Sequence, residues 1–285
     1  MIIMKMNEKG YLGKLKELKK SIYLTKRNKI IKVIKDISSI SLSLLFFILI
    51  WYLIRYIPFF SVIPSPINVF KKFVILWSDG IFGVKLWQHV IISLGRVLLG
   101  FFYSFIIAVP LALLCGSVKI INRLITPIID LLRPIPPIAW IPFAILLFGL
   151  STLSYTFIIF IGAFFPLFQN TYDAIKSVKR VYKDVALSLG ANKIQIISDV
   201  IIPSITPNII TGSKISIGVG WMCIIAAEMI GISSNTGIGL FIMIMQSIAQ
   251  IDSMIAGMIM IGLVGILIAI MFQLIEKILF KWREK

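Results

Sequence analysis

Hydrophobic residues in this chain gather in long runs that are separated by shorter polar stretches. A helix needs about 20 predominantly apolar residues to cross a bilayer, so each such run is a candidate membrane span. Six runs approach that length, and the pattern therefore indicates an all-α membrane protein with six transmembrane helices. The predicted helices lie at about 37–57, 90–115, 130–149, 152–169, 212–231 and 254–276.

Composition agrees with this class. Hydrophobic residues make up 59% of the chain and charged residues 14%, which is roughly half the charge of a typical globular protein. The first 36 residues are polar and basic, and the first apolar run is too long for the core of a secretory signal peptide. We therefore expect a basic arm at 1–36 and one membrane domain at 37–285, embedded in the lipid bilayer of the plasma membrane.

The net charge of +17 raises the question of nucleic-acid binding, but its distribution argues against it. Eleven of the 29 lysines and arginines lie in the arm, and most others fall in a few loops and at the C-terminus. Aromatic residues interleaved with basic ones, as nucleic-acid binding requires, are absent. Cytoplasmic loops of membrane proteins carry an excess of Lys and Arg, so both termini are predicted to be cytoplasmic. The arm itself is either a helix lying on anionic lipid or a solvated tail that only sets topology.

The residues needed for catalysis or metal binding do not assemble in this sequence. Cys115 and Cys223 both lie in apolar segments, and His89 has no Cys or His at ligand spacing. A GxxxxGK[ST] phosphate loop is missing as well. We expect no catalytic residues, no metal and no cofactor, so this chain is not predicted to be an enzyme.

A polar, helix-prone island at 184–207 interrupts the apolar pattern with the sequence DVALSLGANKIQIISDVIIPSITP. Asp184 opens it, Gly190 lies six residues on, and Pro203 closes it thirteen residues later. Glycine adopts backbone angles closed to other residues, so the spacing predicts two short helices joined by a bend at Gly190. The nearby lysines place the island in the cytoplasm, where its apolar positions would fit a groove on a partner. The alternative is a loop that packs only on its own bundle.

This island resembles the coupling loop, called the EAA loop, of permease subunits of bacterial ABC importers. That family pattern is Glu-Ala-Ala, three residues, Gly, nine residues, then Ile-x-Leu-Pro. Here it reads Asp-Val-Ala at 184–186, Gly190, then Val-Ile-Ile-Pro at 200–203. The resemblance implies a coupling loop at about 173–207 whose contact residues include Asp184, Val185, Ala186, Gly190, Ala191 and Pro203.

Five further stretches are similar, in order and spacing, to the nitrate, sulfonate, taurine and bicarbonate branch of that family. They are IPSPINVF at 63–70, LWQHVIISLGRVLLGF at 86–101, LRPIPPIAWIPFAILLFGLS at 132–151, GAFFPLFQNTYDAIKSV at 162–178 and GWMCIIAAEMIGISSNTGIG at 220–239. The resemblance covers about residues 60–283.

The resemblance implies the type I importer fold and a transport pathway for a small solute, driven by separate proteins. The partners it implies are two cytoplasmic ATPase subunits, an extracytoplasmic solute-binding protein and a second permease copy. It points to an anion such as a sulfonate, taurine, nitrate or bicarbonate. Permeases for thiamine-precursor pyrimidines look similar, so they remain an alternative. A stand-alone secondary transporter would show inverted repeats, and none is visible in the sequence.

Prolines crowd the third predicted helix at positions 134, 136, 137 and 142. Proline removes amide donors, and unpaired carbonyls at bilayer depth are tolerated only inside protein or along a watery path. The candidate pathway therefore includes Pro134, Pro136, Pro137 and Trp140. The alternative is a kink that serves packing alone.

Ionisable residues inside a membrane are functional candidates because burying them is costly. Glu228 in the fifth predicted helix and Arg96 in the second fall at similar depth. They form an ion pair with each other, or Glu228 is hydrated, or they contact substrate. Gln169, Asn170 and Trp221 are further pathway candidates. One face of the fifth helix carries Gly212, Ser216 and Gly220, and such a small-residue face allows close helix packing.

Overall fold

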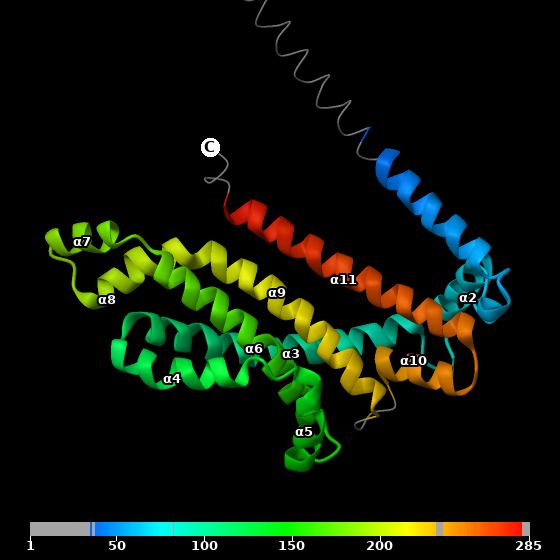
Figure 1. The fold of residues 1–285 in the computed structure, drawn as a ribbon. Coiled ribbons are helices and arrows are strands. Elements are labelled where there is room, and N and C mark those ends of the chain that lie inside the picture. The colour runs from blue at the N-terminus through cyan, green and yellow to red at the C-terminus, as the bar shows by residue number, and fades with distance from the viewer. Residues whose placement is uncertain (1–34, 36–37, 82, 232–235, 281–285) are drawn as a thin grey trace, which may run out of the picture. The chain divides into compact units, whose positions relative to one another are not determined.

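The structure is a computed structural model that describes residue 35 and residues 38–81, 83–231 and 236–280 (Figure 1). Apart from Lys35, the basic arm predicted at 1–36 lies outside the described residues. The chain divides into two compact units, 1–66 and 67–285. The described part of the first unit contains an apolar helix at Ser38–Ile54 and the short 3-10 helix η1 at Pro58–Phe60. The first predicted span, 37–57, is therefore helical but shorter than expected.

The second unit is built from helices. They are α2 (Pro66–Ser78), α3 (Leu86–Ser117), α4 (Lys119–Leu132), η2 (Pro137–Trp140), α5 (Ile141–Phe148), α6 (Thr152–Ser177), α7 (Arg180–Ser188), α8 (Lys193–Gln195), η3 (Ile196–Ile201), α9 (Ile202–Met229), α10 (Ile238–Ser247) and α11 (Ile251–Leu279). Among the described residues, α3, α6, α11 and the continuous helix Lys193–Met229 are long and apolar enough to cross a membrane. These four confirm the second, fourth, fifth and sixth predicted spans.

Small residues let the long helices approach closely. A methyl group added at Gly100 of α3 would lie 2.6 Å from the Ile159 side chain of α6. On α9, one added at Gly212 would lie 2.9 Å from Asn170, and one at Gly220 would lie 3.2 Å from Ile159. The small-residue face predicted on the fifth helix therefore packs against α6, as expected from its spacing.

The third predicted span, 130–149, is wrong in its bounds and its shape. Residues 119–132, which we expected to be mostly loop, form α4, and α4 and the η2–α5 segment are bent by 93° at a short break. The segment forms a helix because α4 is amphipathic, although it lacks a continuous apolar run. Ile129 is buried, and half-buried apolar residues at mostly four-residue spacing lie with it against α3 and α6, namely Ile121, Ile125 and Leu132. Counting the bent pair as one span gives up to five spans in the described residues.

The expected end of the island at Pro203 is also wrong. The helix that begins at Lys193 runs through Pro203 to Met229, a length of 37 residues. Pro203 occupies the first turn of α9, directly after the π-helical turn η3. A π-helical turn has wider i→i+5 bonding, and the Ile202 amide donates to the Ile197 carbonyl in that pattern. This local widening accommodates the missing amide hydrogen of Pro203 without ending the helix.

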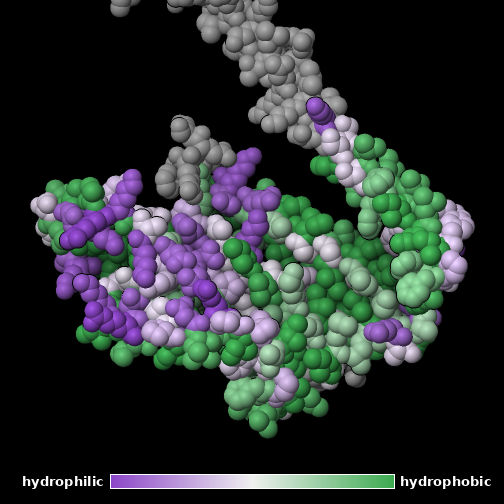
Figure 2. Space-filling view, in the orientation of Figure 1, coloured by the Kyte–Doolittle hydropathy of each residue, from purple (hydrophilic) through white to green (hydrophobic). Residues whose placement is uncertain are grey.

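The surface of the second unit separates polar from apolar regions. Figure 2 shows hydrophilic residues concentrated around the end that carries α7 and α8, whereas hydrophobic residues dominate the region of α10 and α11. An apolar exterior of this kind faces lipid in an integral membrane protein. The α7–α8 end is thus the most polar part of the unit in this view.

Candidate functional site

The α7–α8 segment protrudes at one end of the second unit (Figure 1). Asp184, Val185 and Ala186 lie within α7, which begins four residues before Asp184 at Arg180. The expectation that Asp184 opens the first short helix is therefore wrong, and its carboxylate is not at the positive end of the helix dipole. It forms an exposed ion pair with Arg180 of the preceding turn at 3.8 Å.

The bend predicted at Gly190 is present. Gly190 has a φ of +84°, a conformation that residues with a Cβ rarely adopt, and space around it is open. The Asn192 side chain then accepts from the Gln195 amide at 2.9 Å and caps the start of α8. The chain therefore reverses at Gly190 and enters the long helix at once.

The protrusion carries apolar side chains that pack inward and others that are exposed. One face packs inward, where Ala186, Ala191 and Ile197 lie against a buried cluster that includes Ile175 and Ile196. The rest of the protrusion exposes large apolar side chains, among them Val181 and Val185 on α7, Leu189 just after it and Ile194 on α8. Leu189 is 82% exposed and Ile194 77% exposed, which is unusual for aliphatic side chains in a polar region. We call this exposed set the coupling face.

The break between α4 and α5 holds the proline-rich candidates. Pro134 and Pro136 are exposed there, whereas Pro137 and Trp140 are half-buried. The Trp140 ring packs edge-on against Phe143 and Phe157, and its buried Nε1 has no hydrogen-bond partner among the described residues. A cavity of about 330 Å³ opens beside the break, and Pro137, Gln169 and Asn170 are among the residues lining it.

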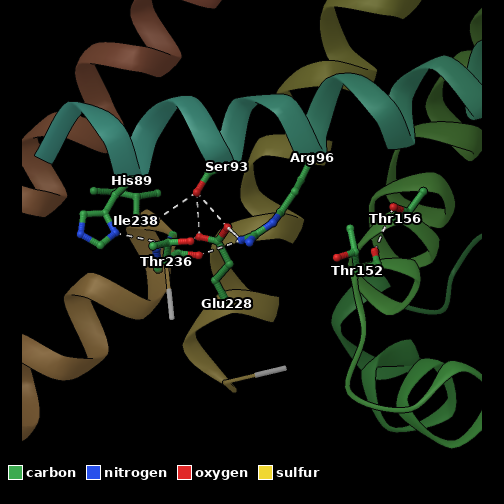
Figure 3. A network of polar contacts seen from close by, with 10 residues as sticks. His89, Ser93, Arg96, Thr152, Thr156, Glu228, Thr236 and Ile238 are labelled. Atoms are coloured by element: carbon green, nitrogen blue, oxygen red, sulfur yellow. Dashed lines mark hydrogen bonds and ion pairs between the residues drawn. The ribbon is translucent and has the colours of Figure 1, made fainter. Parts of the chain in front are cut away.

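A buried polar network lies where α3, the end of α9 and the start of α10 meet (Figure 3). The Arg96 guanidinium donates to the Glu228 carboxylate at 2.6 Å, and the Glu228 side chain is fully buried. The Ser93 hydroxyl and the Gly239 amide donate to the same carboxylate at 2.8 and 3.0 Å. The predicted Arg96–Glu228 pair is therefore formed, and Glu228 is buried and ion-paired rather than hydrated.

The same network fastens the chain that leads into α10. The Arg96 guanidinium also donates to the Thr236 carbonyl at 3.1 Å, and its charge lies 4.7 Å from the centre of the Tyr155 ring. The Gly237 amide donates to His89 Nδ1 at 3.1 Å, and the Ile238 amide donates to the Ser93 hydroxyl at the same distance. The His89 side chain is thus part of a structural network.

The pathway candidates are therefore not gathered in one place. Trp221 is buried and donates from Nε1 to the Ile261 carbonyl of α11, and neither Trp221 nor Glu228 lines the cavity at the helix break. Sequence reasoning missed Ser93 and Gly239, because no local signal marks a serine or glycine that meets an acid far away in the chain. It also did not single out Arg133, which lines the cavity.

Comparison with protein-family models matches residues 108–285 to the family described as binding-protein-dependent transport system inner membrane component. The chain belongs to this family. It is a permease subunit of an ABC importer, and in such systems ATP hydrolysis is carried out by separate subunits.

Relatives of this permease agree over most of its length. It is 44% identical over 207 residues to a putative ABC transporter permease of Methanocaldococcus jannaschii, covering 72% of this chain and 77% of that one. It is 30% identical to the taurine transport system permease of Escherichia coli, with 82% and 85% covered. It is 33% identical to the bicarbonate transport system permease of Synechococcus elongatus, with 72% and 76% covered.

A solved structure of the MetNI methionine ABC transporter in inward-facing conformations contains a chain of the same fold. The TM-score is 0.57 at 20% identity, and the match covers 67% of this chain and 94% of that chain. The helical architecture described above is therefore that of a type I importer permease. Importers of this class work with ATPase and solute-binding partners.

Proposed function

We propose that this permease forms the pathway for a small anionic solute and is driven by two ATPase subunits that dock on the coupling face. The proposal of ATPase docking rests on the exposure of Leu189 and Ile194 on either side of the Gly190 bend. Exposed apolar side chains on a short protruding helix and the turn after it are suited to a groove on a partner protein. Asp184, Val185, Ala186, Gly190, Ala191 and Pro203 then belong to the coupling segment, with Ala186 and Ala191 holding it to the bundle.

The distribution of charged residues supports a cytoplasmic position for the coupling face. Lys179, Arg180, Lys183 and Lys193 surround it, and an excess of basic residues favours the cytoplasm. With α7 and α8 cytoplasmic, the segment after α2 and the turn after α10 lie on the opposite side, where a solute-binding protein docks.

A second permease copy completes the pathway in this proposal. α5 presents Phe143, Leu146 and Leu147 as exposed apolar side chains directly beyond the helix break. The cavity beside Arg133 and Pro137 lies at the same helix break, and in this proposal a second copy packed against α5 encloses it. The broken helix then lines the pathway, since irregular backbone at membrane depth is tolerated along a watery cavity.

The anionic substrate class is supported by the relatives, which are named for taurine, aliphatic sulfonates, nitrate and bicarbonate. The test is uptake into proteoliposomes that contain this permease together with its ATPase and solute-binding partners. We expect ATP-dependent uptake of at least one labelled anion among taurine, nitrate and bicarbonate. Uptake of a thiamine-precursor pyrimidine but of none of these anions would contradict the proposal, as would uptake that needs no ATPase.

A further inference from the structure

The cavity beside the helix break combines apolar walls with a small polar group. Its volume is about 330 Å³, and its walls include Phe165 and Pro166 of α6 and Val219 of α9. The polar side chains that line it are Arg133, Gln169 and Asn170. Small-molecule sites are mostly apolar cavities in which a few polar groups orient the ligand.

Arg133 is the charge in this cavity. It follows the last residue of α4, and its backbone amide donates to the Ile129 carbonyl, so the helix fixes where its side chain begins. The two ion pairs found among the described residues, Arg96 with Glu228 and Arg180 with Asp184, do not involve it. Arg133 is an exposed residue at the break between α4 and η2, so water or an anionic ligand can reach its guanidinium. Either would compensate a charge that membrane depth makes costly.

The two amides are held in place by α6 itself. The Asn170 side chain donates to the Pro166 carbonyl, one turn earlier on the same helix, at 2.8 Å. The Gln169 side chain donates to the Asp173 carboxylate at 3.0 Å. Asp173 itself does not line the cavity. Its carboxylate lies one helical turn beyond Gln169 and is occupied by the hydrogen bond from the Gln169 side chain.

We propose that the Arg133 guanidinium, with Asn170 and Gln169 beside it, forms an anion-binding subsite in the transport pathway. The planar fork of a guanidinium matches the paired oxygens of a sulfonate, nitrate or bicarbonate, which is a geometry that lysine does not reproduce. The cavity has room for such an anion together with water. The subsite rests on the proposed function for its physiological ligand, but its attraction for anions is a property of this chain alone.

The test uses the full permease–ATPase complex with Asn170→Cys as the only cysteine of the permease, after Cys115→Ala and Cys223→Ala, and the reaction is followed on the separated permease chain. The probes are negatively charged sulfonatoethyl methanethiosulfonate and neutral methyl methanethiosulfonate, and the measured quantity is the ratio of their reaction rates. Because a fixed cation concentrates anions in a low-dielectric cavity, we expect Arg133→Gln to lower this ratio about ten-fold. Arg133→Lys, which keeps the charge, is expected to retain most of it.

The matched control is a cysteine at Leu150, an exposed residue in the turn beyond α5, where Arg133→Gln should leave the ratio unchanged. An unchanged ratio at position 170, an equal fall at position 150, or no reaction at position 170 with either reagent would each overturn the subsite. The neutral reagent also reports whether a variant keeps its fold. Absence of anion uptake by the wild-type complex would instead overturn the proposed function and leave this rate ratio standing.

Discussion

Arg96 and Glu228 lie 132 positions apart in the sequence, yet the Arg96 guanidinium and the Glu228 carboxylate meet at 2.6 Å in the interior of the second unit. Their side chains are 11% and 0% exposed. Around them, Ser93 and the amides of Ile238 and Gly239 complete a network that joins α3, α9 and α10. The pair therefore fixes the start of α10, and its removal should be felt first in stability.

We expect Arg96→Met to lower the free energy of unfolding by about 3–5 kcal/mol, because it leaves a buried carboxylate without its counter-charge. The apparent melting temperature of the purified permease–ATPase complex measures this. Ser93→Ala is the matched control, since it removes one hydroxyl that donates to Glu228 and accepts from Ile238 but keeps both charges, and it should cost about 1–3 kcal/mol. Adding Glu228→Leu to Arg96→Met should recover part of the loss. Equal melting of wild type and Arg96→Met would rule out a structural role for the pair.

Gly100 and Gly95 offer a second matched comparison, on the same helix. A Cβ at Gly100 would lie 2.6 Å from the Ile159 side chain, whereas nothing lies within 4 Å of one at Gly95. Gly100→Ala should therefore destabilise the complex by about 1–3 kcal/mol through overpacking. Gly95→Ala should be neutral or stabilise α3 by up to about 1 kcal/mol. Thermal melting of the two variants measures this difference in stability. Indistinguishable melting curves would contradict the close approach of α3 and α6.

Gly190 tests the coupling face. With a φ of +84°, Gly190→Val should strain the bend by about 1–2 kcal/mol, and the coupling face should then fit its partner poorly. Asparagine tolerates this backbone region better, so Gly190→Asn is the control expected to keep transport. Co-purification of the ATPase and ATP-dependent uptake are the measurements. Full transport and normal ATPase association in Gly190→Val would remove the coupling role from this bend.

A substitution at Asp184 distinguishes a role in ATPase docking from a role in the folding of the same segment. Its ion pair with Arg180 is exposed, and exposed pairs contribute about 0–1 kcal/mol, so Asp184→Asn should melt like wild type. If the carboxylate contacts the ATPase, substrate-stimulated ATP hydrolysis should still fall. A loss of stability without any change in ATPase activity would point to a structural role instead.

Membrane orientation follows from the distribution of Lys and Arg and is checked by reporter fusions. Fusions after Gly80 and after Ala249 should report the outer side, and one after Gly190 should report the cytoplasm. These positions fall in turns that follow α2, α10 and α7. A fusion after Gly190 that reports the outer side would invalidate the proposed topology and, with it, ATPase docking on the coupling face.

The long spans and the glycine bend were predictable from the sequence because their signals are local. Continuous apolar runs mark α3, α6 and α11, and the four-residue spacing of Gly212, Ser216 and Gly220 marks the face that packs on α6. Gly190 stands between two helix-prone stretches, so a positive φ there was a direct expectation.

Other features depend on partners that a linear pattern does not reveal. α4 was not predicted as a helix because Lys119 and Arg123 interrupt its apolar run. Its apolar residues recur with a helical period and pack against α3 and α6. Ser93 and Gly239 acquire their roles only when folding brings α3 and α10 to Glu228. Pro203 was expected to end a helix, but the π-helical turn before it carries the chain through.

The continuity of the helix from Lys193 to Met229 has a mechanical consequence. At about 1.5 Å per residue, its 37 residues make a lever about 55 Å long. Glu228 anchors one end of that lever to α3, and the other end begins three residues after the Gly190 bend. A tilt of about 5° around the anchored end would sweep the Lys193 end through about 5 Å, roughly one helical turn. The π-helical turn at 196–201 interrupts the regular α-helical bonding of this lever. Its stiffness would then set how much of a push on the protruding segment reaches the membrane.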